Sequence, residues 1–397
     1  MGDGELYLAS LLEGAVAKVP QARDLRDFLW TAASIGLRDI VDHVVTPSGD
    51  HARCGWTHVA PGVWRNLNGL PALRDGDGVR VALRVDDIET LLAALGLDSE
   101  VRGAAHTPFR QATLFEAEGV AFDAVERCGW TGFEAPEVNP RQLRRARIYR
   151  QTLATRRRAF RDPGQGYVHL SRLLEAAVAD LGAPWASGVF VRAELDHWRA
   201  QCSDAHLLGA QRERVGVGWS DAIQLAFTAS RANFQRAAGV ARMLGYRQGA
   251  WIFDAASGAG AQRFECPLLA RPALIIECDG PDAPAAPLVE QTWLAAPGLW
   301  SALHGEGMLE GGARAVSIAS ERVAAVRRKP VAPARVDALE RERYLSRNAA
   351  EDLRLNGAEG PRVHAGPKIA PYTQLAALQG ETAPPPQRQR HRVKRQA

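Results

Sequence analysis

The stretch of residues 216–280 constrains the fold of this chain more than any other part of it. Its residues 223–227 (Ile-Gln-Leu-Ala-Phe) alternate apolar with small or polar side chains, which is typical of a strand with one buried face. Apolar residues then recur at helical spacing from Phe234 to Leu244, and Gly245 ends that segment. Three short apolar runs follow, separated by turn-forming residues: 250–253, 261–264 and 273–276. This order predicts one βαβββ unit.

The beginning of this pattern occurs a second time, earlier in the chain. Residues 80–86 (Arg-Val-Ala-Leu-Arg-Val-Asp) align with residues 224–230 (Gln-Leu-Ala-Phe-Thr-Ala-Ser), and each run leads into a helical segment that a glycine ends. The strands expected after the first helix are residues 101–104, 110–115 and 120–127. A weaker third copy begins at 314–318, with a helix at 320–328. Such units pair across a shared core, so we predict an α+β fold in which repeated βαβββ modules form cupped mixed sheets.

These patterns resemble a known superfamily. A first strand of the form Val-Ala-Leu-Arg-Val-x-Asp that runs into a helix, and a last strand that ends in Ile-Ile-Glu, are similar to the vicinal oxygen chelate superfamily of glyoxalases and extradiol dioxygenases. Residues 180–357 also resemble an uncharacterised bacterial family near it, in which the segment that matches 216–231 is rich in histidine. The resemblance implies a divalent metal in a cupped sheet, which chelates two adjacent oxygens of a small substrate.

The resemblance also implies where metal ligands would lie. The ligand position on the first strand falls on Gln224 in the second half and on Arg80 in the first. The position on the last strand falls on Glu277 and Glu126, with Glu265 as a competitor on the middle strand. Glutamine can ligate through its amide oxygen, whereas arginine cannot. Oxygen and imidazole donors suit Fe, Mn, Zn or Ni.

The expected histidines are absent from these strands. A dioxygenase of this type is expected to use two histidines and a carboxylate, but neither 223–230 nor 314–320 contains a histidine. His304 lies two positions before Glu306, a spacing that places both side chains on one face of a strand. Glu277 alone also fits an internal hydrogen-bond or ion-pair partner. The ligand-binding candidates are Gln224, Phe227, Trp251, Glu265, Glu277 and His304, and the metal candidates are Gln224, Glu277, Glu265 and His304.

Two functions therefore stay open, and we favour the first. It is a protein that binds a small organic molecule in a cupped sheet whose metal site is degenerate or absent. The alternative is a metal-dependent dioxygenase or lyase. Other chemistry has no support, because residues 258–262 (Gly-Ala-Gly-Ala-Gln) lack the lysine and the following helix of a phosphate loop, and no Gly-x-Ser-x-Gly elbow occurs.

Basic residues concentrate in two segments. Residues 141–161 hold nine arginines and no acid, and the tail 380–397 holds five Lys or Arg residues against Glu381. The whole chain carries a formal net charge of only +4, so the rest of it is acidic. A nucleic-acid-binding fold is expected to carry its basic residues over the folded surface, so binding of nucleic acid is the least favoured alternative. The arginines that we expect to be solvated are Arg144, Arg145, Arg147, Arg156, Arg157 and Arg158.

Helical spacing and composition suggest how the chain is divided. Residues 5–47 are expected to be helical, with His43 near their end as a solvated or helix-dipole-compensating residue. Glu194 and His197 share one face of a later helix, without a second such pair to complete a metal site. The expected parts are N-terminal helices (1–48), a first βαβββ-like module (49–139), a basic linker helix (140–165), a second half with βαβββ modules (166–335), a C-terminal helix (336–358) and a disordered basic tail (359–397).

No apolar run approaches the ~20 residues that a membrane helix needs. The N-terminus is acidic where a secretory signal would be basic. Five cysteines without a Cys-x-x-Cys pair indicate neither a disulfide framework nor a zinc knuckle. We therefore expect a cytoplasmic protein with a small-molecule ligand and no membrane partner, and the sequence leaves its oligomeric state open.

Overall fold

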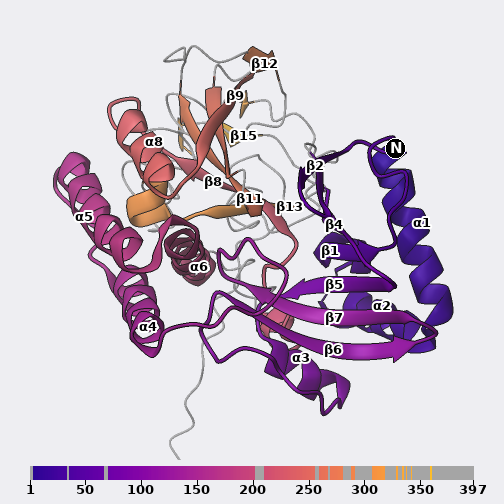
Figure 1. Ribbon diagram of the computed structural model, residues 1–397. Coiled ribbons are helices and arrows are strands. Elements are labelled where there is room, and N and C mark those ends of the chain that lie inside the picture. The colour runs from indigo at the N-terminus through magenta and orange to yellow at the C-terminus, as the bar shows by residue number, and fades with distance from the viewer. Residues whose placement is uncertain are drawn as a thin grey trace, which may run out of the picture.

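A computed structural model shows a mixed α+β protein built on two mixed sheets (Figure 1). The predicted fold class is confirmed. The C-terminal helix expected at 336–358 lies almost entirely outside the described residues, and so does the tail. The structure describes residues 3–33, 35–66, 70–201, 210–254, 259–266, 269–279, 288–290 and 306–317, with a few positions beyond them that include β14 (Arg328–Lys329) and β15 (Ala358–Glu359).

The first sheet has the strand order β2-β3-β4-β1-β5-β7-β6. Its strands are β1 (Val41–Thr46), β2 (Trp56–Ala60), β3 (Val63–Asn66), β4 (Ala72–Asp75), β5 (Val79–Val85), β6 (Phe109–Ala117) and β7 (Val120–Arg127). β5 runs parallel to β7, which pairs antiparallel with β6. Helix α3 (Ile88–Leu95) follows β5, and Gly96 ends it in a left-handed conformation, as expected. The predicted strand at 101–104 is reduced to an isolated bridge between Arg102 and Gln111.

This sheet contains a second unit that the sequence did not reveal. β1 runs parallel to β4, and β4, β3 and β2 follow one another antiparallel, which repeats the order of the β5 unit. A turn at 51–55 takes the place of the helix. The two units join through the antiparallel pair of β1 and β5. The helical expectation for residues 5–47 is therefore wrong for 41–46, whose β-branched Val, Val, Val and Thr side chains favour a strand.

Three helices cover one face of the first sheet. They are α1 (Asp3–Lys18), α2 (Pro20–Ala33) and α3, and their buried side chains form one apolar core with strands β1, β5, β6 and β7. In α1 and α2 the buried positions repeat at helical spacing: Leu8, Leu12, Ala15, Ala22, Leu25, Leu29 and Ala33. The opposite face carries polar side chains from β5, β6 and β7 beside a small apolar cluster of Ala82, Phe109 and Val125.

The second sheet has the order β12-β9-β10-β11-β8-β13 and contains the predicted unit. Its elements are β8 (Ala222–Thr228), α8 (Phe234–Met243), β9 (Arg247–Asp254), β10 (Ala259–Cys266), β11 (Leu269–Asp279), β12 (Leu288–Glu290) and β13 (Arg314–Ser317). β8 runs parallel to β11, and β11, β10 and β9 are antiparallel neighbours. β13 pairs antiparallel with β8 as β1 does with β5. The first strand of the third copy is thus confirmed, and its helix lies outside the described residues.

Three further helices connect the sheets: α4 (Pro140–Thr155), α5 (Pro163–Leu181) and α6 (Ala183–Gln201). Figure 1 shows α6 between the two sheets. Its Phe190 ring stacks on Phe227 of β8 at 6.0 Å between centroids, inside a core shared with α5 and α8. None of the described helices is both long and apolar enough to span a membrane.

Two of the arginines that were expected to be solvated are buried. Arg156 and Arg158 both pair with the fully buried carboxylate of Glu194 on α6, at 2.5 and 3.0 Å. They also donate to the carbonyls of Met308 (2.6 Å) and Leu309 (3.0 Å), which lie in η2 (Gly307–Gly311), a π-helix of about one turn. A turn this short cannot satisfy its own carbonyls. The prediction that Arg156 and Arg158 are solvated is therefore wrong, because their guanidinium groups donate to the η2 carbonyls that lack a partner within the turn.

The two halves of the chain meet backbone to backbone. Gly129, after β7, has φ +77°, and a Cβ there would lie 1.7 Å from the carbonyl oxygen of Pro184. At Gly188 on α6 a Cβ would lie 2.4 Å from the carbonyl carbon of Cys128. Further along, the backbone amides of Asp86 and Asp87 both donate to the Gly216 carbonyl at 2.9 Å. Only glycine permits approaches this close.

Candidate functional site

The predicted ligand positions lie on one face of the second sheet. Register pairs Gln224 of β8 with Ala273 of β11, and Thr228 with Glu277. Since side chains alternate along a strand, Gln224, Thr228 and Glu277 share the face opposite the helices. All three are buried. Gln224 and Glu277 are nevertheless four residues apart along the strands, about 13 Å at ~3.3 Å per residue.

Arg263 of β10 occupies the space beside Gln224. Its Nη1 lies 3.5 Å from the amide oxygen of Gln224, and its Nε donates to Glu265 at 2.6 Å. The structure thus brings Gln224 and Glu265 together, but around a guanidinium group. A divalent cation held by these oxygens would be repelled by that charge. With Glu277 four residues away and no imidazole among these donors, the described side chains do not fit a resident metal.

The remaining candidates lie elsewhere. Phe227 points to the opposite face of β8, into the core of the second half. Trp251 is in the same core, with its ring edge-on to Phe234 at 5.9 Å between centroids. Neither reaches the face that carries Gln224. His304 lies outside the described residues.

The first sheet fills its corresponding face with its own side chains. Arg80, which aligns with Gln224, donates to both oxygens of the fully buried Asp123 carboxylate at 2.6 and 2.8 Å. Gln111 and Thr113 donate to the same carboxylate at 2.9 and 2.8 Å. The Asp123 oxygens therefore accept four hydrogen bonds within the protein, which leaves them no open acceptor position for a ligand. Asp123 is not among the residues predicted from the sequence, although alternation along residues 120–127 places it on the polar face.

Glu126 is not the counterpart of Glu277. Register pairs Arg84, which aligns with Thr228, with Val125, so Val125 takes the position of Glu277. Glu126 is one residue further and points to the other face, because a shift of one residue reverses the side. There it accepts from the Ile88 amide (2.7 Å) at the start of α3. Burial raises the pKa of Glu126, against the opposing effect of that amide.

Glu126 also belongs to an acidic group with Asp87 and Glu89, whose oxygens lie within 4.8 Å of one another. Two of the three side chains are exposed. Arg110 already pairs with Glu89 and, at 2.9 Å, with Glu126. One guanidinium therefore offsets part of the charge of this group.

His43 is buried in strand β1, so it is neither solvated nor at a helix end as expected. Its Nδ1 lies 2.9 Å from the Asp42 carboxylate, which also accepts from Arg127 at 2.6 Å. Burial lowers the pKa of His43, although Asp42 opposes the change. The pKa of Asp42 lies well below its ordinary value, because Arg127 and His43 outweigh the effect of burial. This cluster ties β1 to the end of β7.

The Glu-x-x-His pair of α6 is also occupied. Glu194 pairs with two arginines, and the Nε2 of His197 lies 2.6 Å from the Glu310 carbonyl in η2. These two side chains hold η2 against α6, which accounts for their place on one helix face.

Comparison with known proteins gives limited similarity. No protein-family model matches the chain, and no curated protein matches it. Among solved structures, a halotolerant catechol dioxygenase is similar over 62% of this chain and 66% of its own, just under two thirds, at 11% identity and a TM-score of 0.18. A Mn(II)-bound glyoxalase from Novosphingobium aromaticivorans is similar over 65% of this chain and 89% of its own, at 10% identity and a TM-score of 0.17. At these TM-scores the similarity carries no argument about activity.

Proposed function

We propose that this protein binds a small organic molecule on the Gln224 face of the second sheet, without a histidine-held metal. The observation that supports this function is the side chain of Thr228. It is 1% exposed, and its hydroxyl has no hydrogen-bond partner among the described residues. A buried hydroxyl without a partner costs free energy, and a bound ligand would remove that cost.

The contrast between the two sheets supports the same proposal. In the first sheet, Arg80 and Asp123 satisfy each other. In the second, the one hydrogen bond that Gln224 makes with the described residues through its side chain is a long contact to Arg263, at 3.5 Å. Oxygen-bearing ligands suit this face, because the Gln224 amide and the Thr228 hydroxyl can each both donate and accept hydrogen bonds.

The metal-dependent alternative rests on Glu277. It is a fully buried carboxylate on the same face as Gln224, and carboxylate oxygens are common metal ligands. Arg263 argues against that alternative, because its guanidinium would repel a cation placed beside Gln224. In the favoured function, Glu277 orients a ligand through hydrogen bonds that it accepts.

The test is a binding screen on the full chain with neutral phenols and diols. Thr228→Val keeps the shape of the side chain and removes the hydroxyl, so a ligand that stabilises the wild type should bind it about tenfold more weakly. Thr57→Val, on an exposed strand position, is the matched control and should bind as the wild type does. Equal binding by Thr228→Val and the wild type would contradict the proposed site.

Metal analysis separates the two candidate functions. Protein purified without added metal should contain no stoichiometric Fe, Mn, Zn or Ni. Stoichiometric metal that Glu277→Gln loses, in a protein that remains folded, would favour the metal-dependent enzyme instead.

A further inference from the structure

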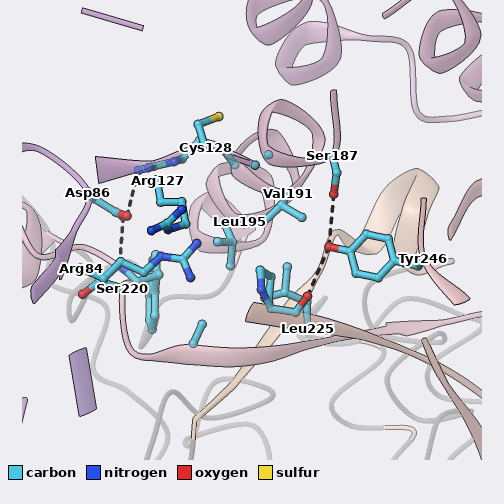
Figure 2. A pocket seen from close by; sticks show the side chains of 16 residues that line it. Arg84, Asp86, Arg127, Cys128, Ser187, Val191, Leu195, Ser220, Leu225 and Tyr246 are labelled. Atoms are coloured by element: carbon cyan, nitrogen blue, oxygen red, sulfur yellow. Dashed lines mark hydrogen bonds and ion pairs between the residues drawn. The ribbon is translucent and has the colours of Figure 1, made fainter. Parts of the chain in front are cut away.

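A small cavity lies between the two halves of the chain, away from the Gln224 face. It measures about 50 Å³ and is lined by the ends of β5 and β7, by α6 and by residues around Ser220 and Tyr246. Figure 2 shows the side chain of Arg84 reaching into the middle of this group. Leu225 also lines the cavity, and it lies on the opposite side of β8 from Gln224. The cavity and the proposed binding face are therefore separate.

Three arginines line the cavity, and two of them are paired. Arg127 donates through Nε and Nη2 to Asp42, and through Nη1 to the carbonyls of Trp130 and Gly132 at 2.6 and 2.7 Å. Arg192 pairs with Asp86 at 3.0 Å. Both nearby carboxylates are thus committed to other cations.

Arg84 is the third arginine, and it makes no hydrogen bond or ion pair with any residue that the structure describes. It is half-buried, and burial lowers its pKa, an effect that Asp42 and Asp86 oppose and Arg127 reinforces. An uncompensated charge in such a place is costly unless something pairs with it. No side chain that lines the cavity supplies a free carboxylate.

A second polar group in the cavity is also without a partner. Ser220 is 3% exposed, and its hydroxyl has no hydrogen-bond partner among the described residues. Tyr246, by contrast, donates to the Pro272 carbonyl and accepts from Ser187, both at 3.2 Å. The unsatisfied groups are therefore a guanidinium fork and a hydroxyl, both of which donate to oxygen.

We propose that this cavity binds a small oxyanion, a carboxylate or a phosphate group, through Arg84 and Ser220. Arginine forms paired, nearly parallel hydrogen bonds with the two oxygens of such a group. The volume suits a single small anion or anionic head group, since one water needs roughly 10–15 Å³ on the same measure. The anion compensates the charge of Arg84, and it stabilises the contact between the halves because both halves line the cavity.

The test measures binding of sodium acetate and sodium phosphate to the full chain, with sodium chloride at equal ionic strength as reference. In the wild type, acetate or phosphate should raise the unfolding midpoint in a saturable way beyond the effect of chloride. Arg84→Gln should weaken that binding about tenfold or more, because it removes a charged donor pair. Arg53→Gln removes an arginine with an 83% exposed side chain, and it should leave binding unchanged.

The two anions also identify the preferred group. Saturation by acetate but not by phosphate assigns a carboxylate, and the reverse assigns a phosphate. The absence of a saturable effect of either anion beyond chloride in the wild type, or equal binding by Arg84→Gln, would overturn the proposal. Failure of the phenol and diol screen would not affect this result, because those probes are neutral.

A measurement on the wild type alone covers the case in which Arg84→Gln does not fold. Cys128 is a half-buried residue with a free thiol that lines the cavity, whereas Cys54, also half-buried and free, does not line it. A bound anion should slow alkylation of Cys128 by iodoacetamide and leave the rate at Cys54 unchanged, as followed by peptide mass spectrometry. Unchanged rates at Cys128 in saturating acetate and phosphate would contradict the proposed site.

Discussion

Replacement of Glu194 by glutamine should destabilise the protein far more than the removal of an exposed carboxylate. Glu194 is fully buried and pairs with Arg156 and Arg158, whose side chains are 1% and 8% exposed. Glu194→Gln leaves two buried guanidinium groups without a counter-charge. Removing one partner of a buried ion pair costs about 3–5 kcal/mol. At roughly 2–4 °C per kcal/mol, the melting temperature should fall by about 6–20 °C.

The same pair gives the stability a pH dependence with a definite sign. Burial alone would raise the pKa of Glu194, but Arg156 and Arg158 outweigh it and hold the pKa below its ordinary value. A carboxyl group with a lowered pKa in the folded state stabilises that state above its unfolded pKa, about 4.3. This contribution is lost as the pH falls from there through the folded-state pKa. In Glu194→Gln that part of the acid slope should be absent.

Urea and thermal unfolding of the variant measure both effects. Glu134→Gln is the control, because Glu134 forms a pair of similar geometry with Arg74 at 3.1 Å but is 78% exposed. Such exposed pairs contribute about 0–1 kcal/mol. A loss below about 1 kcal/mol for Glu194→Gln, or an acid slope equal to that of the wild type, would refute the account of the buried pair.

Three further changes test other parts of the structure. Asp123→Asn should cost about 2–3 kcal/mol in urea unfolding, because Arg80 loses its buried counter-charge. Gly129→Ala should prevent a stable fold or lower its stability by more than ~3 kcal/mol, whereas Gly239→Ala, where a Cβ meets nothing within 4 Å, should be neutral or stabilising. His43 has a pKa lowered by burial, so it stabilises the protein above about pH 6.5 and loses that contribution below it; His43→Gln should flatten that part of the profile. A steeper profile for His43→Gln than for the wild type would contradict this sign.

The sequence predicted the second sheet better than the first. For β8, α8 and the three strands that follow, the hydrophobic periodicity, the glycine that ends the helix and the turn residues all predict the same elements. Local sequence signals were therefore enough to predict this unit. In the unit that begins with β1, a bulge between Val41 and His43 breaks the alternation, and a turn replaces the helix. The β-branched residues at 41–46 are the available signal. They lie shortly after two genuine helices, and helical spacing alone does not mark where the helical region ends.

The candidate site was predicted less well, for two physical reasons. First, an alignment error of one residue assigns a side chain to the wrong face of a strand. The alignment of Glu126 with Glu277 contained such an error, and the two side chains lie on opposite faces of their sheets. Second, a charge run does not reveal its partners. Arg156 and Arg158 resemble their solvated neighbours in the sequence, and only the distant Glu194 makes their burial favourable. The same holds for Arg84, because the sequence does not show that the nearby carboxylates Asp42 and Asp86 pair with Arg127 and Arg192 instead.

The close approach of backbone at Gly129 and Gly188 bears on how a ligand could enter the molecule. Two parts of a protein can rotate about a hinge only if few close contacts are lost when they separate. Here the backbone of one half directly contacts the backbone of the other, so such a rotation would break close contacts. The amides of Asp86 and Asp87, both held by the Gly216 carbonyl, resist the same rotation from another point. Entry to the cavity should therefore depend on rotation of side chains at its mouth. We therefore expect the two halves to move together, and mutations that loosen this contact should affect folding before they affect access to the cavity.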